Sequence, residues 1–240
     1  MTSPSRADRL WKLLNDYAQR DGSVVNAKVV CAVAVELLKV TGASLTVIVD
    51  PARWDAPTTS DALSAELEEL QFTLGEGPGS DAMSRGGPVI VADLAEQGGE
   101  ARWPVFTAAA VAAGAAAMFV FPLTSGAIRL GVLALYRVKS GPLSPDLMKD
   151  AIVLAELALL VLLHAADGVS SDGRSWTGQG LSVGRQQVYQ ATGMISAQLD
   201  VGLDEALVRL RAYAFGNERT LAEVAGDVVA RRLRFSPEPV

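Results

Sequence analysis

The chain has 240 residues, half of them apolar and a fifth charged, with a formal net charge of −6. This ordinary globular composition predicts one large domain or two smaller ones. A single Cys and a single His exclude an internal disulfide and a His–Cys metal site, which fits a reducing compartment.

Hydrophobic periodicity in the first third predicts three helices and one strand. The helices cover about 5–20, 25–41 and 61–70, and the β-branched stretch 43–50 is the strand. We expect Gly42 to end the second helix, and we expect Cys31, on the apolar run of that helix, to be a core residue. Three glycines and a proline in 75–79 predict a loop without regular structure.

The middle of the chain predicts further strands and a long helix. A strand is expected at 88–93, a helix from Pro104 to Gly114, a hairpin around Ser125–Gly126, and an apolar helix at about 144–165. Pro122 places the first hairpin strand at a sheet edge or marks a bulge. This order predicts an α+β fold, with a largely antiparallel sheet and helices on its faces.

Five segments of this part form a characteristic set. They are LQFTLGEGPGSDA at 70–82, PVIVADL at 88–94, RWPVF at 102–106, FPL at 121–123 and LGVLALY at 130–136. The set resembles the GAF family of small sensory domains over about 24–165. The resemblance implies a pocket between sheet and helices that holds a small molecule, or a fold used only for dimerisation. Neither His164, on the last helix, nor Cys31 suits a haem or bilin ligand, so we expect no cofactor.

A Gly/Ser-rich segment at 167–180 divides the chain. It carries no apolar period and predicts a flexible linker, so we expect domains at 1–166 and 181–236. Residues 1–180 hold 14 basic and 20 acidic side chains, whereas 181–240 hold seven of each, every cation being Arg. The acidic excess disfavours non-specific nucleic-acid binding by the first part, and the balanced tail permits it.

No segment is suited to targeting or to spanning a membrane. The start lacks an apolar core of signal-peptide type. The apolar stretch 108–123 is broken by Gly114 and Pro122, and 151–163 is shorter than the ~20 apolar residues of a spanning helix. We therefore expect a cytoplasmic protein with no membrane partner.

The tail predicts three amphipathic helices. They cover about 183–199, 203–215 and a third that follows the T-x-x-E capping box of Thr220 and Glu223. The apolar stripes are Val188, Ala191, Ile195 and Leu199, then Leu203, Leu207, Leu210 and Ala214, then Leu221, Val224, Ala225 and Val228. Helices of this length predict a small three-helix bundle, with Gly202 at the N-cap of the second helix.

The first tail helix carries Ala191-Thr192-Gly193 in its middle. Gly in a helix interior costs about 1 kcal/mol relative to Ala, and Thr is stiff there. Ala191 lies on the apolar stripe, so close helix packing accounts for it. Gly193 lies off the stripe, where a small residue lets a bulky partner such as a nucleic-acid backbone or base approach.

Four short motifs follow one another along the tail: Gln190-Ala191-x-Gly193-Met194, Asp204-Glu205-Ala206, Leu210-Arg211-x-x-Ala214 and Leu221-x-x-Val224-Ala225. Together they resemble the ANTAR family of RNA-binding transcription antiterminators, and a GAF sensor joined to an ANTAR domain is a known pairing. The resemblance implies that the tail binds a pair of hairpins in a nascent transcript and stabilises them against an overlapping terminator. RNA sequence is read best in such loops, where bases are unstacked.

The predicted RNA-binding residues are Gln190, Ala191, Thr192, Gly193, Arg211, Tyr213 and Arg219. Gln190 and Thr192 can donate and accept hydrogen bonds, and Gly193 permits close approach. Arg211 and Arg219 can contact phosphate, and Tyr213 can stack on a base. Structural roles stay open beside these: Arg211 as a solvated helix charge and Tyr213 as a partly buried edge residue.

The tail departs from the family pattern in one respect. The family often has Lys where this chain has Thr192, and Glu218 in the turn can mute the charge of Arg219. RNA binding is therefore expected to be weak for a single domain. It would depend on a homodimer or on a hairpin pair, because two tethered contacts raise avidity.

Two other functions stay open. Three short helices can form a helix-turn-helix, so the chain could be a ligand-sensing DNA-binding transcription factor, although 221–230 is mostly apolar and acidic. The sensor could also act through protein partners. We expect no enzyme, because the single His has no catalytic partner in a motif and 75–79 lacks the Lys-Ser/Thr of a phosphate-binding loop.

Overall fold

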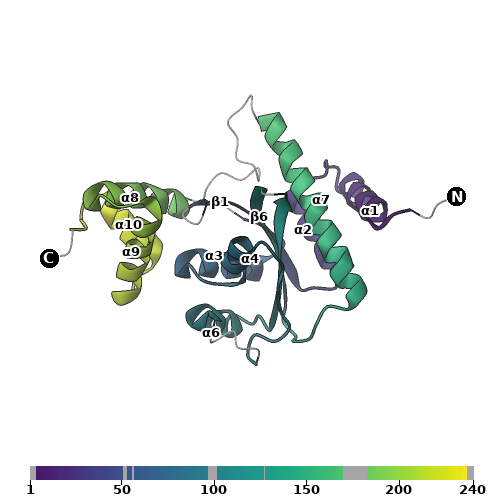
Figure 1. Ribbon diagram of the computed structural model, residues 1–240, viewed down its shortest axis with the longest axis horizontal. Coiled ribbons are helices and arrows are strands. Elements are labelled where there is room, and N and C mark those ends of the chain that lie inside the picture. The colour runs from purple at the N-terminus through teal and green to yellow at the C-terminus, as the bar shows by residue number, and fades with distance from the viewer. Residues whose placement is uncertain are drawn as a thin grey trace.

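The computed structural model describes residues 4–50, 53–55, 57–96, 102–126, 128–169 and 183–236. The chain forms two parts (Figure 1). The described residues from 4 to 169, the N-terminal part, hold a sheet with helices on both of its faces, and residues 183–236 form the C-terminal bundle of three helices. The predicted α+β class is therefore confirmed.

The sheet has six strands in the order β2-β1-β6-β5-β4, with β3 beside β1. The strands are β1 (Gly42–Asp50), β2 (Arg53–Trp54), β3 (Thr58–Thr59), β4 (Val89–Val91), β5 (Ala117–Ser125) and β6 (Ile128–Arg137). Each pairing is antiparallel. The expected hairpin forms β5 and β6, and β6 then pairs with β1 from Gly42↔Tyr136 to Val47↔Gly131.

Alternation along the strands separates two cores. Phe119 and Phe121 of β5 point to the face covered by α1 (Arg6–Arg20), α2 (Ala27–Leu38) and α7 (Pro145–Val169). Met118 and Val120 point to the face covered by α3 (Ala62–Leu74), α4 (Pro78–Arg85) and α6 (Pro104–Ala112) (Figure 1). Successive strand residues face opposite sides, so an almost continuous apolar strand is buried on both. Cys31 lies in the first core, as predicted.

Several boundaries differ from the predictions. Lys39, with φ of 54°, ends α2 instead of Gly42, which opens β1. Gly42 is needed there for a different reason, since a Cβ would lie 2.0 Å from Oδ2 of Asp61. The predicted loop at 75–79 is wrong in its second half, because α4 begins at Pro78, where the fixed φ of proline suits the first turn of a helix. The glycines and proline of 75–79 predicted a loop by composition, so the start of this short helix was not predicted.

Two other predictions concern Pro122 in β5 and the end of the long helix α7. Pro122 lies beyond the last pair between β5 and β4, Val89↔Val120, and just before a register shift at Leu123/Thr124. This is the edge or bulge position that proline requires. Helix α7 continues to Val169, so the first residues of the predicted linker are helical. The remainder of that linker, 170–180, lies outside the described residues.

The C-terminal bundle consists of α8 (Val183–Leu199), α9 (Leu203–Gly216) and α10 (Leu221–Val229). Thr220 and Glu223 form the predicted capping box, and Gly202 is the N-cap of α9. The predicted stripes are buried or half-buried except for Leu203, which is 55% exposed. Leu203 is the first residue of α9 and is exposed to solvent, and Ala206 is buried in its place.

Candidate functional site

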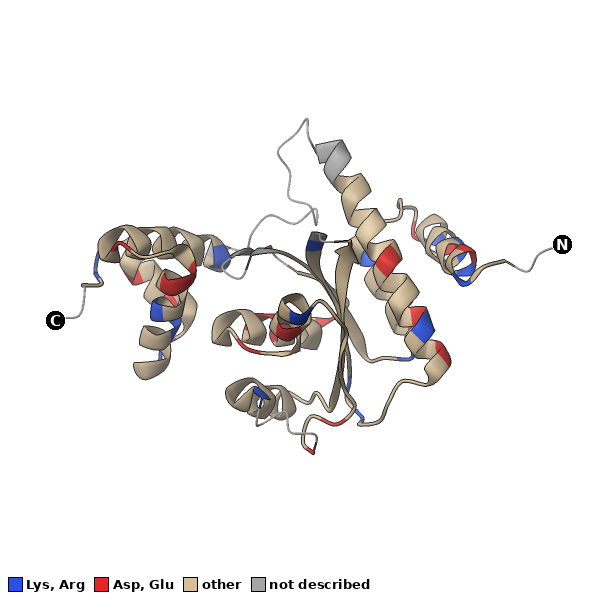
Figure 2. Cartoon of the chain, in the orientation of Figure 1, with Lys and Arg blue, Asp and Glu red and all other residues tan. Residues whose placement is uncertain are grey.

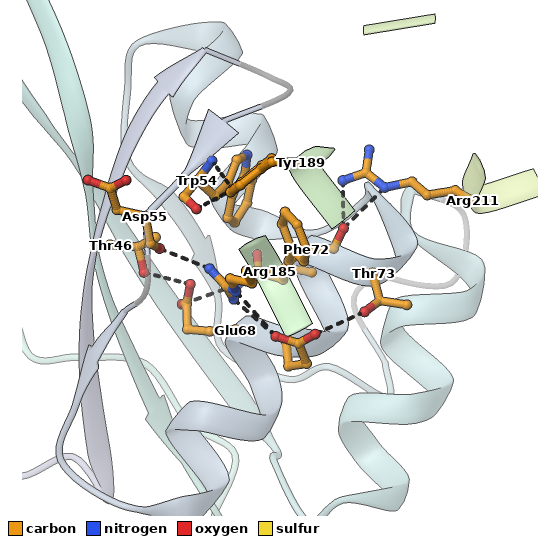
Figure 3. A network of polar contacts seen from close by, with 11 residues as sticks. Thr46, Trp54, Asp55, Glu68, Phe72, Thr73, Arg185, Tyr189 and Arg211 are labelled. Carbon is orange, nitrogen blue, oxygen red and sulfur yellow. Dashed lines mark hydrogen bonds and ion pairs between the residues drawn. The ribbon is translucent and has the colours of Figure 1, made fainter. Parts of the chain in front are cut away.

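Among the described residues, three side chains of the C-terminal bundle donate hydrogen bonds to the N-terminal part: Arg185 and Tyr189 from α8 and Arg211 from α9 (Figure 3). Arg185 and Tyr189 are four residues apart, so they project from one face of α8. All three reach β2, the segment after it, or α3. We call this contact the docking site.

Arg185 is the most deeply buried of the three, with 3% of its side chain exposed. Its Nη1 donates to the carbonyl oxygen of Asp55 at 2.9 Å, and its Nε and Nη2 donate to Oε2 of Glu69 at 3.4 and 3.2 Å. Its guanidinium carbon lies 4.5 Å from the ring centroid of Phe72. A planar cation over an aromatic face, with acceptors at its edge, is a favourable environment for arginine.

A buried carboxylate lies close to Arg185 (Figure 3). Glu68 is 1% exposed and accepts hydrogen bonds from Oγ of Ser44 at 2.8 Å and from Oγ1 of Thr46 at 2.7 Å. Burial raises the pKa of Glu68, while the two hydrogen bonds and the positive charge of Arg185 oppose that rise. The docked bundle therefore brings a compensating cation to a buried acid of the N-terminal part.

Tyr189 binds the main chain of β2, the outermost strand on its side of the sheet. Its hydroxyl donates to the carbonyl oxygen of Trp54 and accepts from the N–H of Trp54 at 2.8 Å. Its ring meets Phe72 edge-on, with the centroids 6.0 Å apart. Edge strands present main-chain groups that need partners, and Tyr189 supplies both partners for Trp54.

Arg211 caps the C-terminal end of α3. Its Nε and Nη2 donate to the carbonyl oxygen of Phe72 at 3.1 and 2.5 Å. The last carbonyls of a helix lack intrahelical partners and carry partial negative charge, so a cation is favoured there. Gly75 follows with φ of 71°, and a Cβ on Gly75 would lie 2.7 Å from Nη1 of Arg211. Burial lowers the pKa of Arg211 to about 10.

The four predicted RNA-binding residues of α8 divide between two environments. Gln190 and Gly193 are exposed, and a Cβ on Gly193 would meet no atom within 4 Å. Ala191 and Thr192 are buried, at 0% and 3% exposure, and Oγ1 of Thr192 donates to the carbonyl oxygen of Val188 at 2.8 Å. Packing within the bundle thus accounts for Ala191 and Thr192, but it does not account for Gly193.

The other three predicted residues lie apart from these. Arg211 is in the docking site, and Tyr213 is half-buried with its ring 5.4 Å from that of Phe235. Arg219 forms an ion pair of 2.7 Å with Asp227. The carboxylate that neutralises the charge of Arg219 is therefore that of Asp227, on the second turn of α10, rather than that of Glu218. The seven predicted residues are thus distributed over several faces of the bundle.

The sequence predictions missed Arg185, Tyr189 and Glu68. A signal for Glu68 was present, because the buried positions of α3 are Ser64, Leu67, Glu68, Gln71 and Phe72, a single helical stripe. An acid on such a stripe is a candidate for a buried charge. Arg185 and Tyr189 carry no comparable signal, since the segment that buries them is more than a hundred residues earlier in the sequence.

A cavity of about 590 Å³ lies between the two parts. Its lining includes Ile48, Trp54 and Met83 from the N-terminal part and Leu207 and Arg211 from α9. The cavity is mostly apolar at this junction, with a few charged groups at its boundary. Ile48 and Trp54 are strand residues and Met83 belongs to α4, so the cavity lies between sheet and helix, and α9 of the C-terminal bundle forms a further wall.

Positive and negative side chains are interspersed over the C-terminal bundle (Figure 2). Arg209 pairs with Glu205 at 2.8 Å, and Arg232 pairs with Asp227 at 2.7 Å. Pairing of this kind lowers the attraction of the bundle for phosphate at long range. A polyanion would therefore have to be recognised through local contacts rather than through a uniformly basic surface.

Other features bear on cofactors and membranes. Burial raises the pKa of Cys31 to about 12, and Nδ1 of His164 lies 2.9 Å from the carbonyl oxygen of Leu160. Within the described ranges, no three His, Cys, Asp or Glu residues are grouped so that they could hold a metal ion. None of the described helices has the length and hydropathy that crossing a bilayer would require.

Comparison with solved structures identifies the N-terminal architecture. The chain is similar to the GAF domain of a phosphoenolpyruvate-protein phosphotransferase from Coxiella burnetii, with 20% identity, a TM-score of 0.51, and coverage of 69% of this chain and 99% of that one. The N-terminal part has the GAF fold. The GAF domain of the Acinetobacter phosphoenolpyruvate-protein phosphotransferase is also similar, with 14% identity, a TM-score of 0.47 and coverage of 70% and 98%.

No protein-family model and no curated protein matches the sequence. The GAF fold accounts for about two thirds of the chain. The docking site therefore joins the part with the GAF fold, called the GAF domain below for its fold, to a helical bundle whose role must be argued from its own residues.

Proposed function

We propose that the chain is a transcription antitermination regulator. Its GAF domain senses a signal, and its C-terminal bundle is an ANTAR domain that binds paired hairpins in nascent mRNA. The order of motifs in the tail supports this proposal, as does a three-helix bundle in which the second motif lies in the first turn of α9 and the fourth motif begins α10. In this proposal the protein is cytoplasmic, has no catalytic activity and carries no cofactor.

The observation that carries the proposal is the position of Arg211. This predicted RNA-binding residue donates two hydrogen bonds to Phe72 of the GAF domain. A guanidinium that caps α3 cannot at the same time present those N–H groups to phosphate or to a loop base. A change in the GAF domain that moves the end of α3 would therefore alter the availability of Arg211, which is what coupling between sensor and output requires.

Gly193 supplies a second argument. It lies in the interior of α8 with open space beside it, so a larger residue would fit and would favour the helix. Its neighbour Gln190 is also exposed and can read a base edge. In the proposed complex, an RNA backbone or loop base approaches α8 at Gly193, where a side chain would keep it at a distance.

The alternative of a DNA-binding transcription factor is less well supported. A recognition helix needs exposed side chains that read base edges in the major groove. The exposed residues of α10 and its C-cap are Ala222, Glu223 and Ala230. Two alanines and an acid offer little for reading bases and would repel phosphate.

The cavity between the GAF domain and α9 is a candidate place for the signal. It is lined by groups of both parts, including Trp54 and Arg211, so an occupant would contact the sensor and the output together. A small molecule there can shift the docking equilibrium only if it binds docked and undocked states with different affinity. We propose that the GAF domain binds a small ligand and that the protein acts as a homodimer.

A mobility-shift titration of the full chain tests the RNA-binding step. The probes are an RNA with two adjacent hairpins, the same RNA with scrambled loops, and duplex DNA, all at fixed salt. The variant Gly193→Glu is compared with Ala108→Glu, which adds the same charge at an exposed position of α6 in the GAF domain. We expect Gly193→Glu to weaken hairpin binding by about tenfold or more, the equivalent of one lost contact to phosphate, and Ala108→Glu to leave it unchanged.

Equal affinity for intact and scrambled loops, or a preference for duplex DNA, would contradict RNA antitermination. A transcription assay with a terminator that overlaps the second hairpin then measures the output. We expect read-through to rise with the wild-type chain and with Ala108→Glu, and to stay at its basal level with Gly193→Glu.

A further inference from the structure

The groups around Arg185 form a binding site that belongs to the GAF domain. Phe72 supplies an aromatic face, Glu69 supplies a carboxylate at the edge, and Asp55 supplies a main-chain carbonyl, while Glu68 is a buried acid nearby. Arg185 is delivered to these groups by α8, from the other part of the chain (Figure 3). Arg185, which occupies the site, can therefore leave it while the site residues stay in place in the GAF domain.

The geometry of the site favours a guanidinium over an ammonium. The two parallel donors Nε and Nη2 share Oε2 of Glu69, and the third donor, Nη1, points to Asp55 on the opposite edge. The flat face of the cation lies over Phe72 at 4.5 Å. An ammonium is a compact, strongly hydrated charge that has neither a flat face nor donors in a fixed fork.

We propose that this site is a receptor for a small alkylguanidinium compound, which competes with Arg185 and thereby releases the C-terminal bundle. The compound replaces the guanidinium of Arg185 between Phe72, Glu69 and the Asp55 carbonyl. Its binding leaves Arg185 outside the site and separates α8 from α3. Arg211 then loses its fixed position at the end of α3, because both arginines belong to the same bundle.

The tether sets how strongly the compound must bind. Arg185 is attached to the same chain, so it competes at an effective concentration on the order of millimolar. A compound that meets an unoccupied site binds more tightly than one that must displace Arg185. This inference does not require that the bundle bind RNA, and its test contains no nucleic acid.

The experiment uses the full chain and two compounds with the same propyl group, N-propylguanidinium and propylammonium, at constant ionic strength. Calorimetric titration compares the wild type, Arg185→Met, which keeps an unbranched apolar side chain, and the double variant Arg185→Met with Glu69→Gln. Glu69 is 57% exposed, so its replacement is compatible with folding. Circular dichroism checks that each variant is folded.

We expect N-propylguanidinium to bind Arg185→Met about tenfold more tightly than the wild type, since the tethered competitor has been removed. The double variant should lose that gain, and propylammonium should bind none of the three proteins measurably. Equal affinity for the two compounds, or an affinity that Glu69→Gln leaves unchanged, would overturn the proposal.

A second measurement on the wild type keeps the test informative if Arg185→Met does not fold. Small-angle X-ray scattering follows the radius of gyration as either compound is added. We expect N-propylguanidinium to increase it, because the bundle leaves the GAF domain, and propylammonium to leave it constant. A radius that responds to neither compound, or equally to both, would show that the site is not a guanidinium receptor.

Discussion

The guanidinium of Arg211 in α9 donates two hydrogen bonds to the main-chain carbonyl of Phe72, near the C-terminal end of α3 in the GAF domain. Phe72 also presents its ring to Arg185 and Tyr189 of α8. One residue of the GAF domain is therefore in contact with all three docking residues of the bundle. A movement of the end of α3 would therefore change its contacts with both α8 and α9.

Gly75 allows this contact, and its replacement should weaken it. Gly75→Ala places a Cβ 2.7 Å from Nη1 of Arg211, at a residue whose φ of 71° is already unfavourable for alanine. Gly22→Ala is the matched control, since Gly22 has φ of 67° and open space around it. Urea unfolding should show a loss of about 1–2 kcal/mol from backbone conformation in both variants. We expect a further loss of roughly 1–2 kcal/mol only in Gly75→Ala, from the disturbed charged hydrogen bonds.

Under the proposed function, Gly75→Ala also frees Arg211 for RNA. Its affinity for the paired hairpins should be higher than that of the wild type, whereas Gly22→Ala should leave affinity unchanged. Equal stability losses in the two variants would mean that Arg211 readjusts without cost, and the docking site would then be weaker than its geometry indicates.

Gly193 should reveal a conflict between stability and binding. Gly193→Ala removes the helix penalty of glycine without any clash, so we expect the free energy of unfolding to rise by about 0.5–1 kcal/mol. Gly226→Ala, in the interior of α10, is the control, because its nearest neighbour would lie at an ordinary 4.0 Å. Both variants should be stabilised in urea unfolding. Only Gly193→Ala should lose affinity for hairpin RNA, and unchanged affinity would remove Gly193 from the proposed interface.

The sequence predicted the elements better than it predicted the site. Periodicity located the helices of the bundle and the strand pair β5–β6 because local spacing determines them. The helix α4 was missed because Pro78 and Gly79 are loop residues by composition, although proline is favoured in a first helical turn. Local pattern could not distinguish these two uses of proline.

The docking site could not be predicted because it depends on contacts between distant segments. Arg185 and Glu69 are 116 residues apart, and nothing in the sequence near Arg185 indicates burial. The sequence predicts that the guanidinium of Arg211 donates hydrogen bonds to RNA. In the structure the guanidinium does donate hydrogen bonds, but its acceptor is a carbonyl oxygen near the end of α3 in the GAF domain. By contrast, the burial of Ala191 followed directly from its stripe.

Glu68 should make stability depend on pH. Its pKa in the folded chain is raised above the ordinary 4.5 by burial. As pH rises above 4.5, the unfolded chain loses this proton while the folded chain retains it. The free energy of unfolding should therefore fall as the pH rises from 4.5 to the folded-state pKa, by roughly 1.4 kcal/mol for each pH unit between these two values. Above the folded-state pKa it should level off. Urea unfolding across this range measures the effect.

The variant Glu68→Gln should flatten that dependence, because an amide does not titrate and can still hydrogen-bond Ser44 and Thr46. Glu66→Gln is the control, since Glu66 is exposed on the same helix and its replacement removes the same charge. A profile that Glu68→Gln leaves as steep as in the wild type would assign the pH dependence to another group.

Helix α7 should form a dimer interface. Ile152, Leu160 and Leu163 are 41%, 46% and 38% exposed on this helix, and Trp11 of α1 is 41% exposed. Apolar side chains at spacings of eight and three residues lie on one side of a helix, where a second copy of the chain would bury them. Leu160→Glu should convert a dimer into a monomer in analytical ultracentrifugation at micromolar concentration. Ala165→Glu adds the same acid at an exposed position on the other side of α7 and should leave the dimer intact. A monomeric wild type would contradict the homodimer, and RNA binding would then rest on the hairpin pair engaging two separate chains.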